Sequence, residues 1–156
     1  MRDQEEGVRP VVTGDLPALR AVIAATGLFP AEMLEGMAAP FLAGEAEEVW
    51  LTAAGGAAVA YVAPERMTQG SWNLLLIAVH PGHQRRGLGA ALVAAVEAEV
   101  IARGGRLLLV ETSSLPDFDG TRAFYRRQGY EQEARIRDFY QAGEDKVVFR
   151  KLLRAD

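Results

Sequence analysis

The sequence predicts an α/β protein whose mixed, mostly antiparallel β-sheet contains one parallel crossover and is flanked by helices. Two observations indicate the antiparallel part. β-rich segments flank the pair Gly55-Gly56, which suits a hairpin, and two more follow Gly129 around the polar stretch QAGED. The third observation is a strand, an amphipathic helix and a second apolar strand between residues 72 and 112. Such a βαβ unit should be parallel and right-handed.

The N-terminal part predicts a strand and two helices before the first hairpin. The segment VRPVV (8–12) is the expected strand. A helix should follow over 13–27, capped by Thr13 or Asp15. A second helix should then be interrupted or ended near Pro40, because proline has no backbone N–H and its ring clashes inside a helix.

The rest of the chain carries the strongest periodic pattern. The strand at 72–79, WNLLLIAV, is an almost continuous apolar run, which predicts burial on both faces. The next helix has an apolar stripe at four-residue spacing, formed by Leu88, Leu92, Val96 and Val100, and Gly104-Gly105 should end it. A buried strand (106–112), a short helix (120–128) and a final hairpin with strands at 130–140 and 146–153 should follow.

Length and composition set the class of protein. A chain of 156 residues with 49% hydrophobic residues can bury its own core, so we expect a single domain over 1–156. It has 0 cysteines, which excludes disulfides, thiolate metal sites and a cysteine nucleophile. The net charge of −4 gives no overall attraction to nucleic acid. Acidic residues near the N-terminus and the lack of a long apolar run argue against a signal peptide or membrane span, so the expected location is the cytoplasm.

The stretch HQRRGLGAAL (83–92) lies where the apolar strand gives way to the most regular helix. The N-terminus of a helix presents unpaired N–H groups and a partial positive charge, so a phosphate can bind there. Glycines at 87 and 89 allow close approach, and Arg85 and Arg86 add charge. The alternative is a turn with solvated arginines. The stretch is neither the dinucleotide loop, whose third glycine position holds Leu92, nor a P-loop, which needs a lysine.

Two motifs resemble those of the GNAT acetyltransferase superfamily. Gln84-Arg85-Arg86-Gly87-Leu88-Gly89 is similar to its Q/R-x-x-G-x-G/A signature. Phe124-Tyr125 followed by Gly129-Tyr130 resembles the late helix that many members write as F-Y-x-x-x-G-F. The order of the N-terminal elements also fits, so the resemblance covers nearly the whole chain. It implies a fold in which the fourth and fifth strands form a splayed parallel pair.

The resemblance implies acetyl-coenzyme A as acyl donor, an amine as acceptor and no metal. The strand positions that match the pantetheine-pairing segment, whose backbone would also face the thioester oxygen, are Ile77, Ala78 and Val79. The positions that match the pyrophosphate loop are Arg85, Arg86, Gly87, Leu88, Gly89 and Ala90. Members of the family are often dimers, and the sequence shows no decisive interface that would establish a homodimer.

The catalytic groups follow from the same resemblance. Tyr125 occupies the position of the general acid, with plain packing as the alternative. Asn73 stands where some members place a glutamate base, and it could hold a water that relays a proton. Glu111, at the end of an apolar strand, is the competing base; otherwise it is a solvated acid or the partner of an arginine. His80 is more typical of a loop or capping residue.

The sequence departs from the family pattern at Phe118, where many members have an asparagine that contacts the cofactor. The neighbouring polar residues that could substitute for it are Ser113, Ser114, Asp117 and Asp119. The acceptor site should include the first two helices, the turn at 68–71 and the final hairpin with Arg135, Arg137, Asp138, Phe139 and Tyr140.

We expect the acceptor to be a small amine or amino acid. A protein N-terminus or lysine, a non-catalytic acyl-coenzyme A sensor and an unrelated nucleotide binder are the alternatives.

Overall fold

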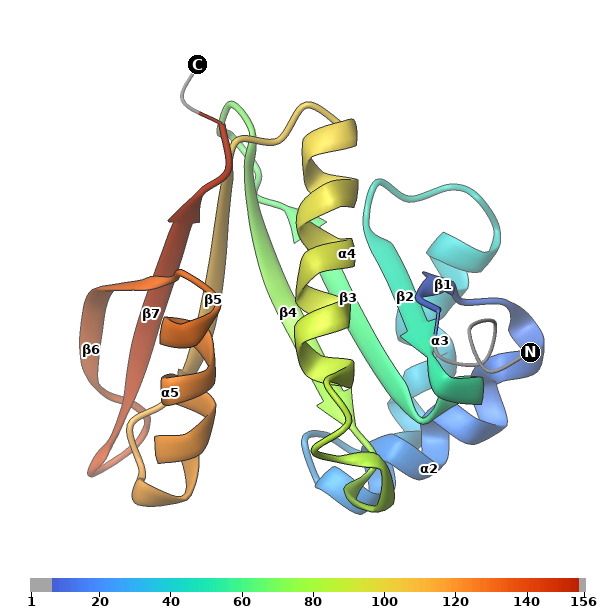
Figure 1. Cartoon of the computed structure of the whole chain (residues 1–156), viewed down its shortest axis with the longest axis horizontal. Helices are drawn as coiled ribbons and strands as arrows, with labels where there is room; N and C mark the ends of the chain where they lie inside the picture. The colour runs from blue at the N-terminus through green and yellow to red at the C-terminus, as the bar shows by residue number, and fades with distance from the viewer. Residues whose placement is uncertain (1–6, 155–156) are drawn as a thin grey trace. The chain divides into compact units, whose positions relative to one another are not determined.

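The computed structural model describes residues 7–154, and these residues group into two compact units. The first unit comprises residues up to 63 together with 75–98, and the second comprises 64–74 and 99 onward. Seven strands of the described residues form one sheet in the order β1-β2-β3-β4-β5-β7-β6 (Figure 1). The single domain over 1–156 stays a prediction, and the acidic N-terminal residues before 7 lie outside the described part.

The elements of the first unit, in chain order, are β1 (Arg9–Pro10), α2 (Leu16–Thr26), α3 (Leu34–Leu42), β2 (Val49–Ala53), most of β3 (Ala58–Pro64), the second half of β4 (Ser71–Val79) and most of α4 (Leu88–Ala102). The second unit contains the remaining parts of β4 and α4, with β5 (Leu107–Ser113), α5 (Asp119–Arg127), β6 (Glu131–Gln141) and β7 (Glu144–Leu152). No helix within 7–154 is long and apolar enough to span a membrane.

The first unit is built around side chains of α2, α3 and strands β2 to β4. Trp50 is fully buried in this cluster and its ring stacks on Tyr61 with a centroid separation of 4.4 Å. Leu76 and Ala78 of β4 join the same cluster. The apolar stripe of α4 is buried as its spacing predicted, because Leu88, Leu92, Val96 and Val100 are at most 6% exposed.

The second unit contains the predicted parallel pair. β4 and β5 pair from Ser71 with Leu107 to Leu74 with Val110 in a parallel ladder, which confirms the crossover. On its other side β5 pairs antiparallel with β7, and β6 pairs with β7 and forms the edge of the sheet. Helix α5 lies along β5 and β7 in Figure 1, and its Tyr125 packs against Phe149.

Several predicted elements differ in detail. β1 has only two residues, and α3 continues past Pro40 to Leu42. A proline this close to the helix end removes one hydrogen bond of the last turns, which the helix tolerates. The hairpin turn between β2 and β3 is a four-residue loop, because the last pair is Ala53 with Ala58. Gly56 is required there, since φ is +93° and a Cβ would lie 2.7 Å from the Ala18 Cβ.

Candidate functional site

The second half of β4 carries the residues expected to pair with the pantetheine arm. Leu75 is 52% exposed, and Ile77 and Val79 are half-buried, so the prediction that this strand is buried on both faces is wrong here. The parallel ladder with β5 ends at Leu74, while β4 continues to Val79. The apolar run therefore marks a strand that extends beyond its ladder with β5 and leaves part of its surface accessible.

A short loop joins β4 to α4 and is held by its own polar groups. The His80 Nδ1 accepts a hydrogen bond from the Gly82 N–H at 3.2 Å, and the His80 N–H donates to the Ala57 carbonyl at 2.7 Å. Gln84 Nε2 lies 3.4 Å from the Val79 carbonyl. His80 is therefore a capping residue of the loop, as the more conservative interpretation of the sequence held.

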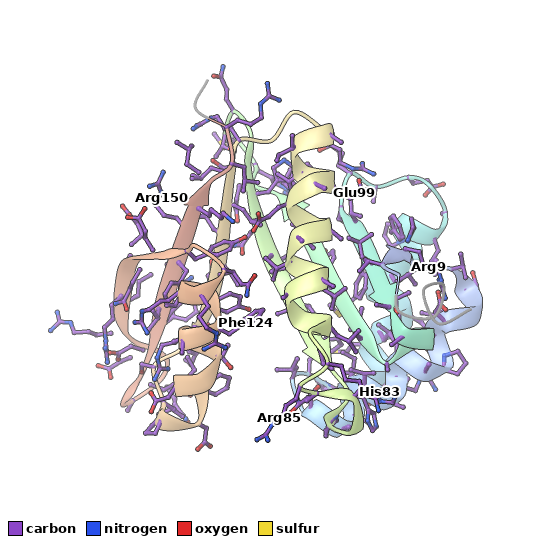
Figure 2. The ribbon with its side chains drawn as sticks, in the orientation of Figure 1. Arg9, His83, Arg85, Glu99, Phe124 and Arg150 are labelled. Carbon is purple, nitrogen blue, oxygen red and sulfur yellow. The ribbon has the colours of Figure 1, made fainter. Side chains whose placement is uncertain are left out.

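The last residues before α4 have the features that an anion requires. Arg85 and Gly87 both have left-handed backbone conformations, with φ of +67° and +77°. A Cβ built on Gly87 meets no atom within 4 Å, so the approach to the backbone is open. Arg85 and Arg86 are exposed, and no carboxylate within 7–154 lies in ion-pair distance of either. In Figure 2 the Arg85 side chain extends outward from this loop.

These features fit a pyrophosphate. The Ala91 N–H donates to the Gly87 carbonyl at 3.0 Å, so the N–H groups of Leu88, Gly89 and Ala90 precede the hydrogen bonding inside the helix. Phosphate oxygens commonly bind such N–H groups at helix N-termini, and the two guanidinium groups, which have no ion-pair partner within 7–154, add positive charge. A non-glycine residue in the left-handed region, such as Arg85, is the kind of strain that accumulates at binding sites.

Tyr125 lies in the second unit, on α5, and is 3% exposed. Its ring packs against Phe124, Tyr130 and Phe149 at centroid distances of 5.4, 6.0 and 5.9 Å. Burial raises the pKa of the Tyr125 phenol well above its usual value, because the charged phenolate would be poorly solvated. The phenol is therefore protonated at neutral pH.

Asn73 and Glu111 are brought together in the same unit, with two partners that the sequence did not reveal. The Asn73 Nδ2 donates to Glu111 Oε1 at 3.1 Å and to Glu65 Oε1 at 3.0 Å. Lys146 Nζ forms an ion pair with Glu111 Oε2 at 3.1 Å. We call these four residues the Asn73 cluster. Glu111 is therefore neither isolated nor paired with an arginine, since it has a lysine partner.

The Asn73 cluster and Tyr125 lie on opposite faces of the sheet of the second unit. Tyr125 packs on Phe149, whose cross-strand partner on β5 is Val110. Glu111 is the next residue along β5, and successive side chains of a strand point to opposite faces. The candidate acid and the candidate base thus lie on different faces of the sheet.

The polar residues around Phe118 mainly hold the backbone together. Arg122 forms hydrogen bonds to the carbonyls of Ser113 and Leu115 and an ion pair with Asp119. The Ser113 hydroxyl donates to Glu144 at 2.6 Å, and the Ser114 hydroxyl accepts from the Asp145 N–H at 2.8 Å. These contacts give Ser113, Ser114 and Asp119 structural partners, and Asp117 stays an untested candidate for cofactor contact.

Two of the hairpin residues named for the acceptor shape the hairpin itself. Arg135 pairs with Asp145 at 2.5 Å, and Asp138 Oδ1 accepts from the Gly143 N–H at 2.8 Å. Phe139 faces the Asn73 cluster, because the Lys146 ammonium lies 4.0 Å from its ring centroid. Burial, together with the negative charges of Glu111 and Glu144, raises the pKa of Tyr140. Phe139 and Tyr140 therefore both lie near charged residues of the second unit.

Sequence reasoning missed Glu65 and Lys146. Glu65 follows β3, and its N–H donates to the Ser71 carbonyl at 2.8 Å across the turn. A hairpin with this register places Glu65 near Asn73, so the turn at 68–71 was the signal that could have located it. The position of Lys146 beside Glu111 depends on the register between β5 and β7, in which Lys146 is paired with Ser113. The sequence alone does not specify this register.

Comparisons with known proteins give a consistent result. A family model described as the acetyltransferase (GNAT) domain matches residues 45–132. A solved structure of a GNAT-family protein from Desulfovibrio desulfuricans is similar, with 35% identity over 95% of this chain and 99% of that chain and a TM-score of 0.83. A search of curated proteins finds no match.

Two further solved structures share the fold. The ribosomal-protein-S18-alanine N-acetyltransferase from Escherichia coli is 25% identical, covering 96% of this chain and 94% of that chain, with a TM-score of 0.72. An aminoglycoside 6'-N-acetyltransferase complexed with coenzyme A is 16% identical over 96% of this chain and 98% of that chain, with a TM-score of 0.77. At that identity, the second likeness concerns the fold alone.

The family model covers more than half of the sequence, and it includes the loop before α4 with its two arginines and open glycine. The sheet order, with its parallel β4 and β5, and the 35% identity to the Desulfovibrio protein agree with it. The chain belongs to the GNAT acetyltransferase family.

Proposed function

We propose that the protein transfers the acetyl group of acetyl-coenzyme A directly to the primary amine of a small molecule or amino acid. The observation that carries this proposal is the loop at 85–90. It combines an open left-handed glycine, the first N–H groups of α4 and two arginines that have no ion pair with any described carboxylate. The name of one structurally similar protein, the ribosomal-protein-S18-alanine N-acetyltransferase, also describes transfer to nitrogen. We therefore expect nitrogen, rather than oxygen, to be the acceptor atom.

Acetyl-coenzyme A would supply an activated thioester, and the chain would supply binding and proton transfer. Arg85, Arg86 and the first N–H groups of α4 would bind the pyrophosphate. The part of β4 that extends past its ladder with β5, Ile77 to Val79, would hydrogen-bond the amides of the pantetheine arm as an added strand does.

Proton transfer would use groups on two faces of the second unit. Tyr125, kept protonated by burial, would donate a proton to the leaving thiolate. On the other face, Glu111 and Asn73 would serve the amine. An acceptor that arrives as an ammonium ion must lose one proton before its nitrogen attacks the thioester carbonyl, and a second as the amide bond forms and the C–S bond breaks. Glu111 would pass one of these protons to solvent, and the other balances the proton that Tyr125 gives to the thiolate. Asn73 cannot accept a proton, but its Nδ2 holds both neighbouring carboxylates. We therefore assign Asn73 a positioning role and Glu111 the role of candidate base.

Release of free thiol from acetyl-coenzyme A, followed in the presence of different amines, tests the proposal. The panel comprises L-lysine, glucosamine, 1,4-diaminobutane and a short peptide with a free N-terminus, with the acetylated product identified by mass spectrometry. Amine-dependent thiol release with an N-acetylated small product supports the proposal. Acetylation of the peptide alone would indicate a protein acceptor instead. Tight binding of acetyl-coenzyme A with no acetylated product from any amine would indicate a sensor and overturn the proposal.

A further inference from the structure

Asn73 is a buried amide that joins two carboxylates. Asn73 is only 5% exposed. Its Nδ2 donates hydrogen bonds to two carboxylates, to Glu65 Oε1 at 3.0 Å and to Glu111 Oε1 at 3.1 Å. Its Oδ1 is buried and has no hydrogen-bond partner among the described residues. A buried polar atom without a partner is unfavourable for stability and requires an explanation. In this protein the unpaired Asn73 Oδ1 belongs to the amide that holds the negative side chains of Glu65 and Glu111 next to each other.

The two carboxylates of the Asn73 cluster have different partners. Glu111 uses both oxygens, because Oε1 accepts from Asn73 and Oε2 pairs with Lys146. Glu65 uses only Oε1, and no cation within the described chain lies in ion-pair distance of its carboxylate. Two negative side chains and one positive side chain leave the Asn73 cluster with a formal charge of −1, and the uncompensated group, Glu65, is exposed to solvent.

The same surface already binds an ammonium group. The Lys146 Nζ lies 3.1 Å from Glu111 Oε2 and 4.0 Å from the centroid of the Phe139 ring. A carboxylate beside an aromatic face is the usual environment for a bound ammonium ion. Phe139 is 51% exposed, so this environment opens to solvent. A second ammonium group would need the same kinds of contact that hold Lys146 in place, a carboxylate and an aromatic ring.

We propose that the Glu65 carboxylate binds the ammonium group of the acceptor amine, with Asn73 holding that carboxylate in position. The inference rests on the proposed acetyltransferase function and narrows its acceptor to amines that arrive as cations. It makes Glu65, rather than Glu111, the residue that meets the acceptor first, because Glu111 is already compensated by Lys146. An ammonium at Glu65 brings the formal charge of the Asn73 cluster to zero.

The test compares wild type with Glu65→Gln, which keeps an oxygen that can accept from Asn73 and removes only the charge. Glu131→Gln, a change of an exposed glutamate on β6 of the same unit, is the matched control. The acceptor is whichever amine of the panel wild type acetylates fastest, and its tertiary N,N-dimethyl derivative serves as a cationic inhibitor that cannot be acetylated to an amide. Steady-state kinetics give KM, kcat and the inhibition constant, and the midpoint shift with acetyl-coenzyme A reports cofactor binding.

We expect Glu65→Gln to raise both the KM for the amine and the inhibition constant of the tertiary amine by about tenfold or more. The kcat at saturating amine and the midpoint shift with acetyl-coenzyme A should change little, and Glu131→Gln should behave as wild type. Unchanged KM and inhibition constant in Glu65→Gln, with wild type active, would overturn the inference and leave the acetyltransferase function intact. Absence of acetylation by wild type would instead refute the proposed function.

Discussion

Tyr125 packs inside the second unit and is also the general acid that we propose. Its ring is part of the apolar contact between α5 and β7, and its hydroxyl is the only polar group it adds. Burial that raises the pKa of the phenol keeps the proton in place, and a proton donor must hold its proton until the leaving group develops charge. Packing and chemistry can therefore be separated by removing the hydroxyl alone.

Tyr125→Phe should lower kcat by about 10²- to 10⁴-fold, the range typical of a general acid. The ring contacts with Phe149 and Tyr130 are kept, so the midpoint of thermal unfolding and its rise with acetyl-coenzyme A should stay within a few degrees of wild type. Thiol-release kinetics and unfolding scans measure the two effects. A variant with wild-type kcat would show that the hydroxyl takes no part in the rate-limiting step.

Gly105 lies where neighbouring side chains leave no room for a Cβ. A Cβ there would lie 2.3 Å from Val100 Cγ1 and 2.7 Å from Trp72 Cδ1, and both side chains are buried. Gly105→Ala should therefore lower the free energy of unfolding by about 1–3 kcal/mol, since the core must shift to admit a methyl group. Urea unfolding measures the change.

Gly120→Ala is the matched control for Gly105→Ala. A Cβ at Gly120, in the first turn of α5, meets no atom within 4 Å. Alanine should stabilise the protein there by up to about 1 kcal/mol, because it favours the helix more than glycine does. Equal effects of the two alanine substitutions would contradict the packing account.

At the level of helices and strands, the sequence predicted features that follow from a repeating apolar pattern, and it missed features that depend on how strands pair. The four-residue spacing in α4 identified a buried face, and Leu92 and Val100 are fully buried. The apolar run of β4 predicted burial on both faces, yet Leu75 is half-exposed, because hydropathy does not reveal where the ladder with β5 ends. The loop at 85–90 could be proposed from its own residues, whereas Glu65 and Lys146 could not, because their contacts depend on how the strands pair.

The start of α2 carries an ion pair that makes stability depend on pH. The Asp15 carboxylate accepts two hydrogen bonds from the Arg9 guanidinium at 2.7 Å and one from the Val12 N–H at 2.8 Å. The hydrogen bonds from Arg9 are the main cause that holds the pKa of Asp15 below its usual value. A carboxyl with a lowered pKa in the folded state stabilises the fold above its unfolded pKa of about 4, and this contribution is lost as pH falls through the folded value.

Asp15→Ala should lower the free energy of unfolding at pH 7 by about 1–2 kcal/mol, because it removes the hydrogen bonds that the carboxylate accepts from Arg9 and from the Val12 N–H. The difference from wild type should shrink as pH falls below about 4, because the wild-type carboxyl then becomes protonated. Urea unfolding at pH 7 and at about pH 3 gives both values. A difference that stays constant with pH would show that the charge of Asp15 contributes nothing.

At the scale of the whole molecule, the proposed chemistry is divided between two compact units. The first contains the loop at 85–90 and the second half of β4, which would bind acetyl-coenzyme A. The second contains Tyr125 and the Asn73 cluster, which would handle protons and the acceptor amine. Cofactor binding and acetyl transfer are therefore separable in experiments, and cofactor binding is the claim on which the others rest.

Thermal unfolding of the purified protein with and without acetyl-coenzyme A tests that claim most directly. Acetyl-coenzyme A at about 100 times its Kd should stabilise the protein by about 2.7 kcal/mol, which raises the midpoint by about 5–10 °C. Two variants serve as a matched pair, because Gly87 and Gly104 both have positive φ and open space for a Cβ. Gly87→Glu places a negative charge where the pyrophosphate would bind, and Gly104→Glu places the same charge just after the other end of α4.

We predict that wild type and Gly104→Glu show the rise and that folded Gly87→Glu does not. A rise of equal size in Gly87→Glu, or no rise in wild type at saturating acetyl-coenzyme A, would contradict the assignment of this loop and the catalytic roles that depend on it.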